Sequence, residues 1–251
     1  MNRRPRLPGG IRACLFDLDG VLTTTARLHA EAWKATFDGV LRDWSRTTGA
    51  PFVPFDAVHD YDDFVDGRPR LEGVRAFLSE RGISVPEGDP GDPPGTATMW
   101  AIGNAKNERV VAAIAAGGAR AYPGSVDFLQ AVRASGLRLA VVSSSANASA
   151  VLETTGLREM VELVVDGNVV SARHLAGKPA PDTFLAAAAD LGCSPADAAV
   201  FEDAQAGVAA GRAGGFGLVV GVDRRGQRRA LLAHGADVVV TDLAELLDEP
   251  A

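Results

Sequence analysis

The stretch IRACLFDLDG, residues 11–20, joins a short apolar run to an abruptly acidic turn. Ile11 to Phe16 is predicted to be a buried strand, because it is mostly apolar and ends at turn-forming residues. Asp17 and Asp19 follow directly, separated only by Leu18. Two carboxylates at the end of a buried strand make this turn the first candidate for a functional site.

Further apolar runs in the second half of the chain also break into polar residues, at 137–143, 198–202, 217–222 and 237–241. Segments with helical character lie between them, at 125–135, 182–191 and 206–213. Strands without apolar–polar alternation, separated by helices, are typical of a parallel sheet covered on both faces. The right-handed crossover rule then predicts a doubly wound, Rossmann-like α/β domain of about five strands.

The segment between the first strand and the rest of this sheet is predicted to be mostly helical. Helices are expected at 26–41, 70–81 and 107–116, and the breaker-rich loop 84–95 separates the last two. We therefore predict a catalytic core made of residues 1–24 and 117–251, with a helical cap domain, residues 25–116, inserted after strand one.

Composition and charge exclude some classes of partner. The chain has 251 residues, 47% of them hydrophobic and 23% charged, which is ordinary for a soluble globular protein. The net charge of −7 argues against nucleic acid or an anionic membrane as partner, since both require a basic surface. Residues 1–10 lack the apolar stretch of a signal peptide or anchor, and the two cysteines form no disulfide framework. A cytoplasmic location is expected.

Polar side chains with complementary chemistry follow several predicted strands. Asp17 and Asp19 follow the first, Ser143 follows the second, and Glu202 and Asp203 follow the next. Ligands bind at the carboxyl ends of strands in open parallel sheets, so these groups should lie together. Clustered acids with oxygen ligands alone suit Mg²⁺, which would relieve their repulsion.

The same residues suggest a mechanism. A carboxylate such as Asp17 can attack phosphorus and form an aspartyl-phosphate, and Asp19, two residues on, can act as acid and base. Ser143 and Lys178, which precedes a predicted helix, can hold the phosphoryl oxygens.

Four motifs in order, Asp17-Leu18-Asp19-Gly20-Val21, Ser143, Lys178 and Glu202-Asp203, resemble those of the haloacid dehalogenase superfamily. The resemblance spans about residues 14–241. It implies that Asp17 is the nucleophile and that Asp19 is the acid–base group. It also implies a Mg²⁺ site formed by Asp17, the backbone carbonyl of Asp19, Glu202 and Asp203.

Within that superfamily the chain is similar to the β-phosphoglucomutase-like branch. The similarity rests on DLDGVLTTTARLHAEAWK (17–34), SSSAN (143–147), GKPAPDTF (177–184) and FEDAQAG (201–207). It implies interconversion of β-glucose 1-phosphate and glucose 6-phosphate, with Arg70 gripping the distal phosphate. The implied substrate-binding residues are Thr25, His29, Trp33, Gly67, Arg70, Lys106, Ser144, Ser145 and Asn147. The chain departs from the branch at Thr24, at Ala146 and in the Pro-rich loop 84–95.

Plainer interpretations exist for several of these residues. The Asp17–Gly20 segment could be a simple turn, His29 an ordinary helix histidine, and Arg70 a solvated residue at a helix start. Ser144 and Ser145 could merely cap a helix, although backbone N–H groups at a helix start would still suit an anion.

Three functions stay open at this point: a mutase, a sugar-phosphate phosphatase of the same superfamily, and a non-catalytic interaction module on the same fold. The expected partner is a small phosphorylated sugar, and the protein is expected to be a monomer or weak homodimer.

Overall fold

The structure is a computed structural model, and it describes residues 3–249. The chain divides into two compact units, one made of Met1–Thr25 and Ala119–Ala251 and the other of Ala26–Gly118. These boundaries lie next to those expected at 24/25 and 116/117.

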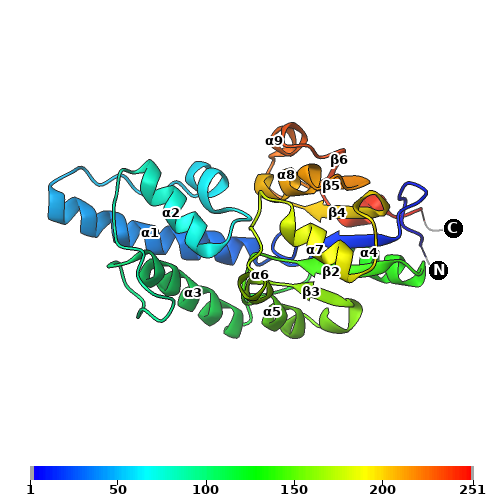
Figure 1. Cartoon of the computed structure of the whole chain (residues 1–251), viewed down its shortest axis with the longest axis horizontal. Helices are drawn as coiled ribbons and strands as arrows, with labels where there is room; N and C mark the ends of the chain where they lie inside the picture. The colour runs from blue at the N-terminus through cyan, green and yellow to red at the C-terminus, as the bar shows by residue number, and fades with distance from the viewer. Residues whose placement is uncertain (1–2, 250–251) are drawn as a thin grey trace. The chain divides into compact units, whose positions relative to one another are not determined.

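The first unit is built on a parallel sheet (Figure 1). Its strands are β1 (Ala13–Phe16), β2 (Arg138–Val142), β3 (Leu163–Val165), β4 (Ala198–Glu202), β5 (Leu218–Val222) and β6 (Val238–Val240). Their order is β3-β2-β1-β4-β5-β6, and every neighbouring pair is parallel. The predicted doubly wound, Rossmann-like class is therefore confirmed.

The prediction of about five strands was one strand short. The missed strand, β3, has only three residues and lies close to Glu162 and Asp166. So short an apolar run has no periodicity of its own, and its pairing with β2 defines it as a strand.

Helices of this unit are α4 (Pro123–Ala134), α5 (Ala148–Thr154), α6 (Gly167–Ala172), α7 (Asp182–Asp190), α8 (Gln205–Ala213) and α9 (Arg228–Ala233). Short 3₁₀ turns lie at Arg158–Met160, Pro195–Asp197 and Leu243–Leu246. The predicted helices correspond to α4, α7 and α8. The short helices α5, α6 and α9 were missed, because six or seven residues give too little periodic pattern.

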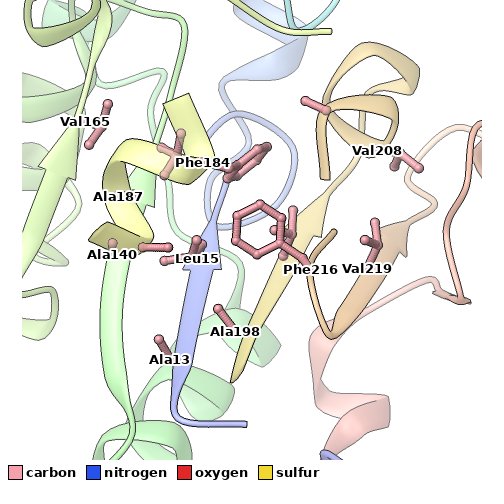
Figure 2. Packing of buried hydrophobic residues seen from close by; sticks show 14 of the residues in the cluster. Ala13, Leu15, Ala140, Val165, Phe184, Ala187, Ala198, Val208, Phe216 and Val219 are labelled. Atoms are coloured by element: carbon pink, nitrogen blue, oxygen red, sulfur yellow. The ribbon is translucent and has the colours of Figure 1, made fainter. Parts of the chain in front are cut away.

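Alternate residues of the strands face opposite sides of the sheet, and both sides are buried. On one side Leu15 packs in a cluster with Phe184 and Ala187 of α7 and Val208 of α8 (Figure 2). On the other side Phe16 stacks on Phe201 with ring centroids 4.5 Å apart, and Phe128 of α4 packs edge-on against both rings. Strands β1 and β4 are thus fixed between two apolar layers, which gives the residues at their ends a rigid base.

The second unit is helical, with α1 (Ala26–Thr48), a π-helical turn (Tyr61–Val65), α2 (Arg70–Glu80) and α3 (Met99–Ala115). Its core centres on Phe37, whose ring lies 5.0 Å from Trp33, 5.3 Å from Phe55 and 4.2 Å from Phe77. Among residues 3–249, no helix combines the length and the apolar character needed to cross a lipid bilayer.

Helix α3 begins eight residues before the expected start at 107. Thr98 caps it, because its Oγ1 accepts a hydrogen bond of 3.0 Å from the backbone N–H of Ala101. Gly103 and Asn104 weaken the helical pattern in the sequence. Gly103 has a packing reason: a Cβ there would lie 3.3 Å from Cγ of Arg70.

Candidate active site

Most of the candidate catalytic residues lie at the carboxyl ends of three neighbouring strands, at one edge of the sheet. Strand β1 lies between β2 and β4, all parallel, so their carboxyl ends meet at that edge. Asp17 follows β1, Ser143 follows β2, and Glu202 ends β4 with Asp203 directly after it. All four side chains are buried. The topology therefore brings together the strand-end residues that the sequence pointed to.

Lys178 connects two of these acids. Its Nζ lies 2.6 Å from Oδ1 of Asp17 and 2.5 Å from Oε1 of Glu202, and it donates a third bond of 3.1 Å to the carbonyl of Val142. The ammonium also lies 4.9 Å from the ring centroid of Phe184. Lys178 is fully buried, so this cation is held in one place by three oxygens.

Burial and charge act against each other at this cluster. Burial tends to lower the pKa of Lys178, but the carboxylates of Asp17 and Glu202 outweigh it and hold that pKa above its ordinary value. Burial raises the pKa of Glu202 to about 7, although Lys178 opposes the rise. The second oxygen of Glu202 accepts a 2.9 Å bond from the backbone N–H of Ala204. Burial therefore decides the direction of the pKa shift at Glu202, despite the neighbouring ammonium of Lys178.

The acids form a group whose composition fits a divalent cation. Asp17, Glu202 and Asp203 each place a carboxylate oxygen within 4.8 Å of the others, and all three are buried. Three carboxylates that place oxygen donors at one point match the ligand preference of Mg²⁺. Asp19 does not add its side chain to this group.

The side chain of Asp19 accepts a hydrogen bond from a threonine that follows it closely in the sequence. Thr25 Oγ1 donates a short hydrogen bond to Oδ1 of Asp19, and Thr25 in turn lies 2.6 Å from the hydroxyl of Thr23. Oγ1 of Thr23 donates a 3.1 Å hydrogen bond to the backbone carbonyl of Leu18. Thr25 was expected in the cap as a substrate-binding residue. The structure places it in the first unit, fully buried against Asp19.

The loop after β2 is organised by its own hydroxyls. Ser143 Oγ accepts a 3.1 Å bond from the backbone N–H of Ser145, and Ser145 Oγ accepts one of 3.2 Å from the N–H of Asn147. Ser144 lies between Ser143 and Ser145 in the sequence, and α5 starts directly after Asn147. The predicted catalytic residue Ser143 and the predicted substrate-binding residues Ser144, Ser145 and Asn147 thus belong to one ordered turn after β2.

In the helical unit, three predicted substrate residues lie together. Nζ of Lys106 on α3 is 3.0 Å from Nδ1 of His29 on α1 and 4.8 Å from the ring centroid of Trp33. All three side chains are largely buried. The pKa of His29 is held well below its ordinary value, mainly by burial and to a lesser extent by the positive charge of Lys106. A neutral His29 can accept from Lys106 through Nδ1, which places its proton on Nε2.

Arg70 is the first residue of α2 and is half-buried. Burial lowers the pKa of its guanidinium, and no carboxylate among residues 3–249 lies within ion-pair distance of it. Gly67 sits three residues earlier at φ +71°, a backbone conformation that favours glycine. A half-buried cation without an acidic neighbour is suited to binding an anion.

Sequence reasoning missed two residues next to the acids, Arg224 and Gln227. Arg224 Nε donates to the carbonyl of Gly20, and Gln227 Nε2 donates to the carbonyl of Asp203. Both lie in the loop after β5. The rule that ligand sites lie at strand ends could have drawn attention to this loop, because the predicted strand 217–222 ends directly before it.

Comparison with known proteins places these residues in a family. A family model described as haloacid dehalogenase-like hydrolase matches residues 11–215. The β-phosphoglucomutase of Mycobacterium tuberculosis is 56% identical over 244 residues, covering 96% of this chain and 93% of that protein. The validoxylamine A 7'-phosphate phosphatase of Streptomyces hygroscopicus is 30% identical over 242 residues, covering 94% and 95%.

A solved structure supports the same relation. A CbbY variant from Rhodobacter sphaeroides, in complex with xylulose-1,5-bisphosphate, superposes with a TM-score of 0.70 at 27% identity, covering 94% of this chain and 96% of that one. The chain is an enzyme, so the hypothesis of a non-catalytic module is wrong. It belongs to the haloacid dehalogenase-like hydrolase family, in its β-phosphoglucomutase-like branch.

Proposed function

We propose that this enzyme is a Mg²⁺-dependent β-phosphoglucomutase that transfers a phosphoryl group through Asp17. One observation carries the proposal: Asp17 lies at the end of the central strand pair, 2.6 Å from the buried ammonium of Lys178 and within the acid cluster. A carboxylate held beside a fixed cation can approach an anionic phosphorus. The identity to the mycobacterial β-phosphoglucomutase supports the choice of reaction.

In the first half-reaction a carboxylate oxygen of Asp17 attacks phosphorus, and the bond from phosphorus to the substrate oxygen breaks. Asp19 supplies the proton that the leaving oxygen needs, and it takes the proton back from the incoming hydroxyl in the second half-reaction. Thr25 suits this role for Asp19, because it fixes Oδ1 and so orients the other oxygen of the same carboxyl group. The hydroxyl and backbone donors of the Ser143–Asn147 turn would hold the phosphoryl oxygens together with Lys178.

For the metal we propose Asp17 and Asp203 as direct ligands, with the backbone carbonyl of Asp19 and the nearby Glu202 completing the site. Glu202 already accepts hydrogen bonds from Lys178 and Ala204, so we also give it the role of holding Lys178. When bound, Mg²⁺ would neutralise negative charge between the transferring phosphoryl group and the acids.

We propose that the helical unit is the cap domain and recognises the substrate. Arg70 and Gly67 are assigned to its distal phosphate, because Arg70 is a half-buried guanidinium. His29, Trp33 and Lys106 are assigned to the sugar, since this cluster offers an imidazole, an aromatic face and an ammonium together. The cytoplasmic location and the monomeric or weakly dimeric state stay predictions.

A sugar-phosphate phosphatase is the second candidate, and the relative named as validoxylamine A 7'-phosphate phosphatase supports it. Both reactions use the same core residues. They differ in the acceptor of the phosphoryl group, which is a sugar hydroxyl in the mutase and water in the phosphatase.

Phosphorus NMR separates the two. The enzyme is given Mg²⁺, β-glucose 1-phosphate and a trace of β-glucose 1,6-bisphosphate. A mutase converts the substrate to glucose 6-phosphate with little free phosphate, whereas accumulating inorganic phosphate identifies the phosphatase. An Arg70→Ala variant that turns over β-glucose 1-phosphate like the wild type would contradict the assignment of the distal phosphate site.

A further inference from the structure

The loop after β5, residues 223–227, contacts both acid-bearing turns of the first unit. We call it the β5 loop. It contains Arg224 and Gln227, whose side chains each donate to a backbone carbonyl in one of those turns. Neither residue is part of the acid cluster itself.

Arg224 joins the Asp17–Gly20 turn to the C-terminal part of the unit. Its Nε donates to the carbonyl of Gly20 at 3.0 Å. Its Nη1 donates to the carbonyl of Thr241 at 2.8 Å and to Oδ2 of Asp242 at 3.0 Å. The guanidinium also lies 3.8 Å from the ring centroid of Tyr122. Because the guanidinium is planar and fixed on three sides, its contact to Gly20 has little freedom to shift.

Gln227 holds the other turn. Its Nε2 donates to the backbone carbonyl of Asp203 at 2.8 Å. The loop is itself rigid, since the carboxylate of Asp223 accepts bonds from the backbone N–H of Gly226 at 2.6 Å and of Gln227 at 2.8 Å. One loop therefore fixes two turns through two different side chains.

The two turns are packed without spare room. Gly20 has φ +91°, and a Cβ built on it would lie 1.9 Å from Oδ2 of Asp203. A displacement of the Gly20 carbonyl would consequently move the Asp17–Gly20 turn against the carboxylate of Asp203. The β5 loop thus contacts both of the closely packed turns that follow β1 and β4.

We propose that Arg224 and Gln227 are positioning residues that set the spacing between the Asp17–Gly20 turn and Asp203, and thereby the affinity of the acid cluster for a divalent cation. The inference rests on the proposed function, because it assumes that this cluster binds Mg²⁺. Outer residues that orient the ligands of a metal contribute about 10–100-fold to its affinity.

The test uses the full chain and the variants Arg224→Lys and Gln227→Met, with Arg229→Ala as the matched control. Arg229 is an exposed arginine just beyond the same loop. Mg²⁺ binding is measured by titration calorimetry, folding by circular dichroism, and kcat and KM with β-glucose 1-phosphate. Arg224→Lys and Gln227→Met should each bind Mg²⁺ about tenfold more weakly or worse, and kcat should fall more than KM rises. Arg229→Ala should match the wild type.

Two outcomes overturn the inference. Variants that melt at a lower temperature yet bind Mg²⁺ with wild-type affinity would show that Arg224 and Gln227 only stabilise the fold. A wild-type protein that binds no Mg²⁺ would refute the proposed function, and the inference with it. Should Arg224→Lys fail to fold, Gln227→Met alone decides, because the proposal requires that it weaken Mg²⁺ binding.

Discussion

Replacing Lys178 with Met should destabilise the first unit strongly, and the loss should depend on pH. Met has a similar volume but no charge, so the substitution removes the ammonium that bonds Asp17 and Glu202 and leaves little cavity. Two buried carboxylates then lose the ammonium that they share. Removing one partner of a buried ion pair costs about 3–5 kcal/mol. At about 2–4 °C per kcal/mol for a chain of this size, the melting temperature should fall by about 6–20 °C.

The pH dependence follows from Glu202. Burial raises its pKa to about 7 while Lys178 opposes the rise, so removing Lys178 should raise that pKa further. The folded variant then keeps a proton that the unfolded chain releases above its ordinary pKa near 4.5. Stability must therefore decrease as pH rises through this window, by up to about 1.4 kcal/mol per pH unit. The melting deficit of Lys178→Met relative to wild type should be larger at pH 8 than at pH 6.

Thermal melts followed by circular dichroism, without Mg²⁺, measure both effects. The double variant Lys178→Met with Glu202→Gln is the matched control, because it removes the acid that Lys178 neutralises. It should recover part of the lost melting temperature at pH 8. A Lys178→Met variant that melts within about 2 °C of wild type, which corresponds to at most about 1 kcal/mol, would contradict this prediction. A melting deficit that is the same at both pH values would contradict it as well.

Three further predictions concern other residues. Thr25→Val removes the hydroxyl that orients Asp19, so kcat should fall about tenfold in steady-state assays while KM changes little. Burial lowers the pKa of His29, so at mildly acidic pH the unfolded chain binds a proton there that the folded chain does not. The free energy of unfolding should therefore fall as pH drops below about 6.5. In urea titrations, His29→Asn should weaken this dependence of the unfolding free energy on pH. Gly207→Ala places a Cβ 1.7 Å from Oε1 of the buried Glu202, so it should lower the free energy of unfolding by about 1–3 kcal/mol in urea titrations. Gly39→Ala meets no atom within 4 Å of its Cβ, so it should raise the free energy of unfolding by about 0.5–1 kcal/mol.

Each of these has a control in the chain. Thr25→Ser keeps the hydroxyl and should retain most of kcat; equal losses in Thr25→Ser and Thr25→Val would argue against the hydrogen bond to Asp19. His174→Asn makes the same replacement at an exposed histidine and is the matched control for His29→Asn. Tryptophan fluorescence reports on the unit that contains His29, because Trp33, Trp44 and Trp100 all lie within residues 26–118.

The sheet could be predicted from the sequence because its longer strands are continuous apolar runs that break into polar residues. That same break marks Asp17, Ser143 and Glu202, since parallel topology turns strand ends into spatial neighbours. Strand β3 escaped prediction because three residues carry no pattern, and only pairing with β2 defines it. Helix α3 was predicted to start eight residues too late, because Gly103 interrupts its pattern to make room for Arg70.

The contacts that orient the acids could not be predicted in the same way. Lys178 bonds Asp17 although 161 positions separate them in the sequence, and Arg224 bonds Gly20 at a separation of 204 positions. Such contacts depend on how strands are ordered in space, which a local pattern does not contain. Thr25 is nearer in sequence, but its role depends on the tight turn that returns its hydroxyl to Asp19.

Transfer of the phosphoryl group to Asp17 is the step on which the proposed function rests. It is tested by mixing the enzyme with Mg²⁺ and β-glucose 1,6-bisphosphate, quenching rapidly in acid, and locating the phosphoryl group by peptide mass spectrometry. One phosphoryl group is expected on the peptide that contains Asp17, and none on that peptide in Asp17→Asn. A phosphoryl group on another residue, or an Asp17→Asn variant as active as the wild type, would contradict it.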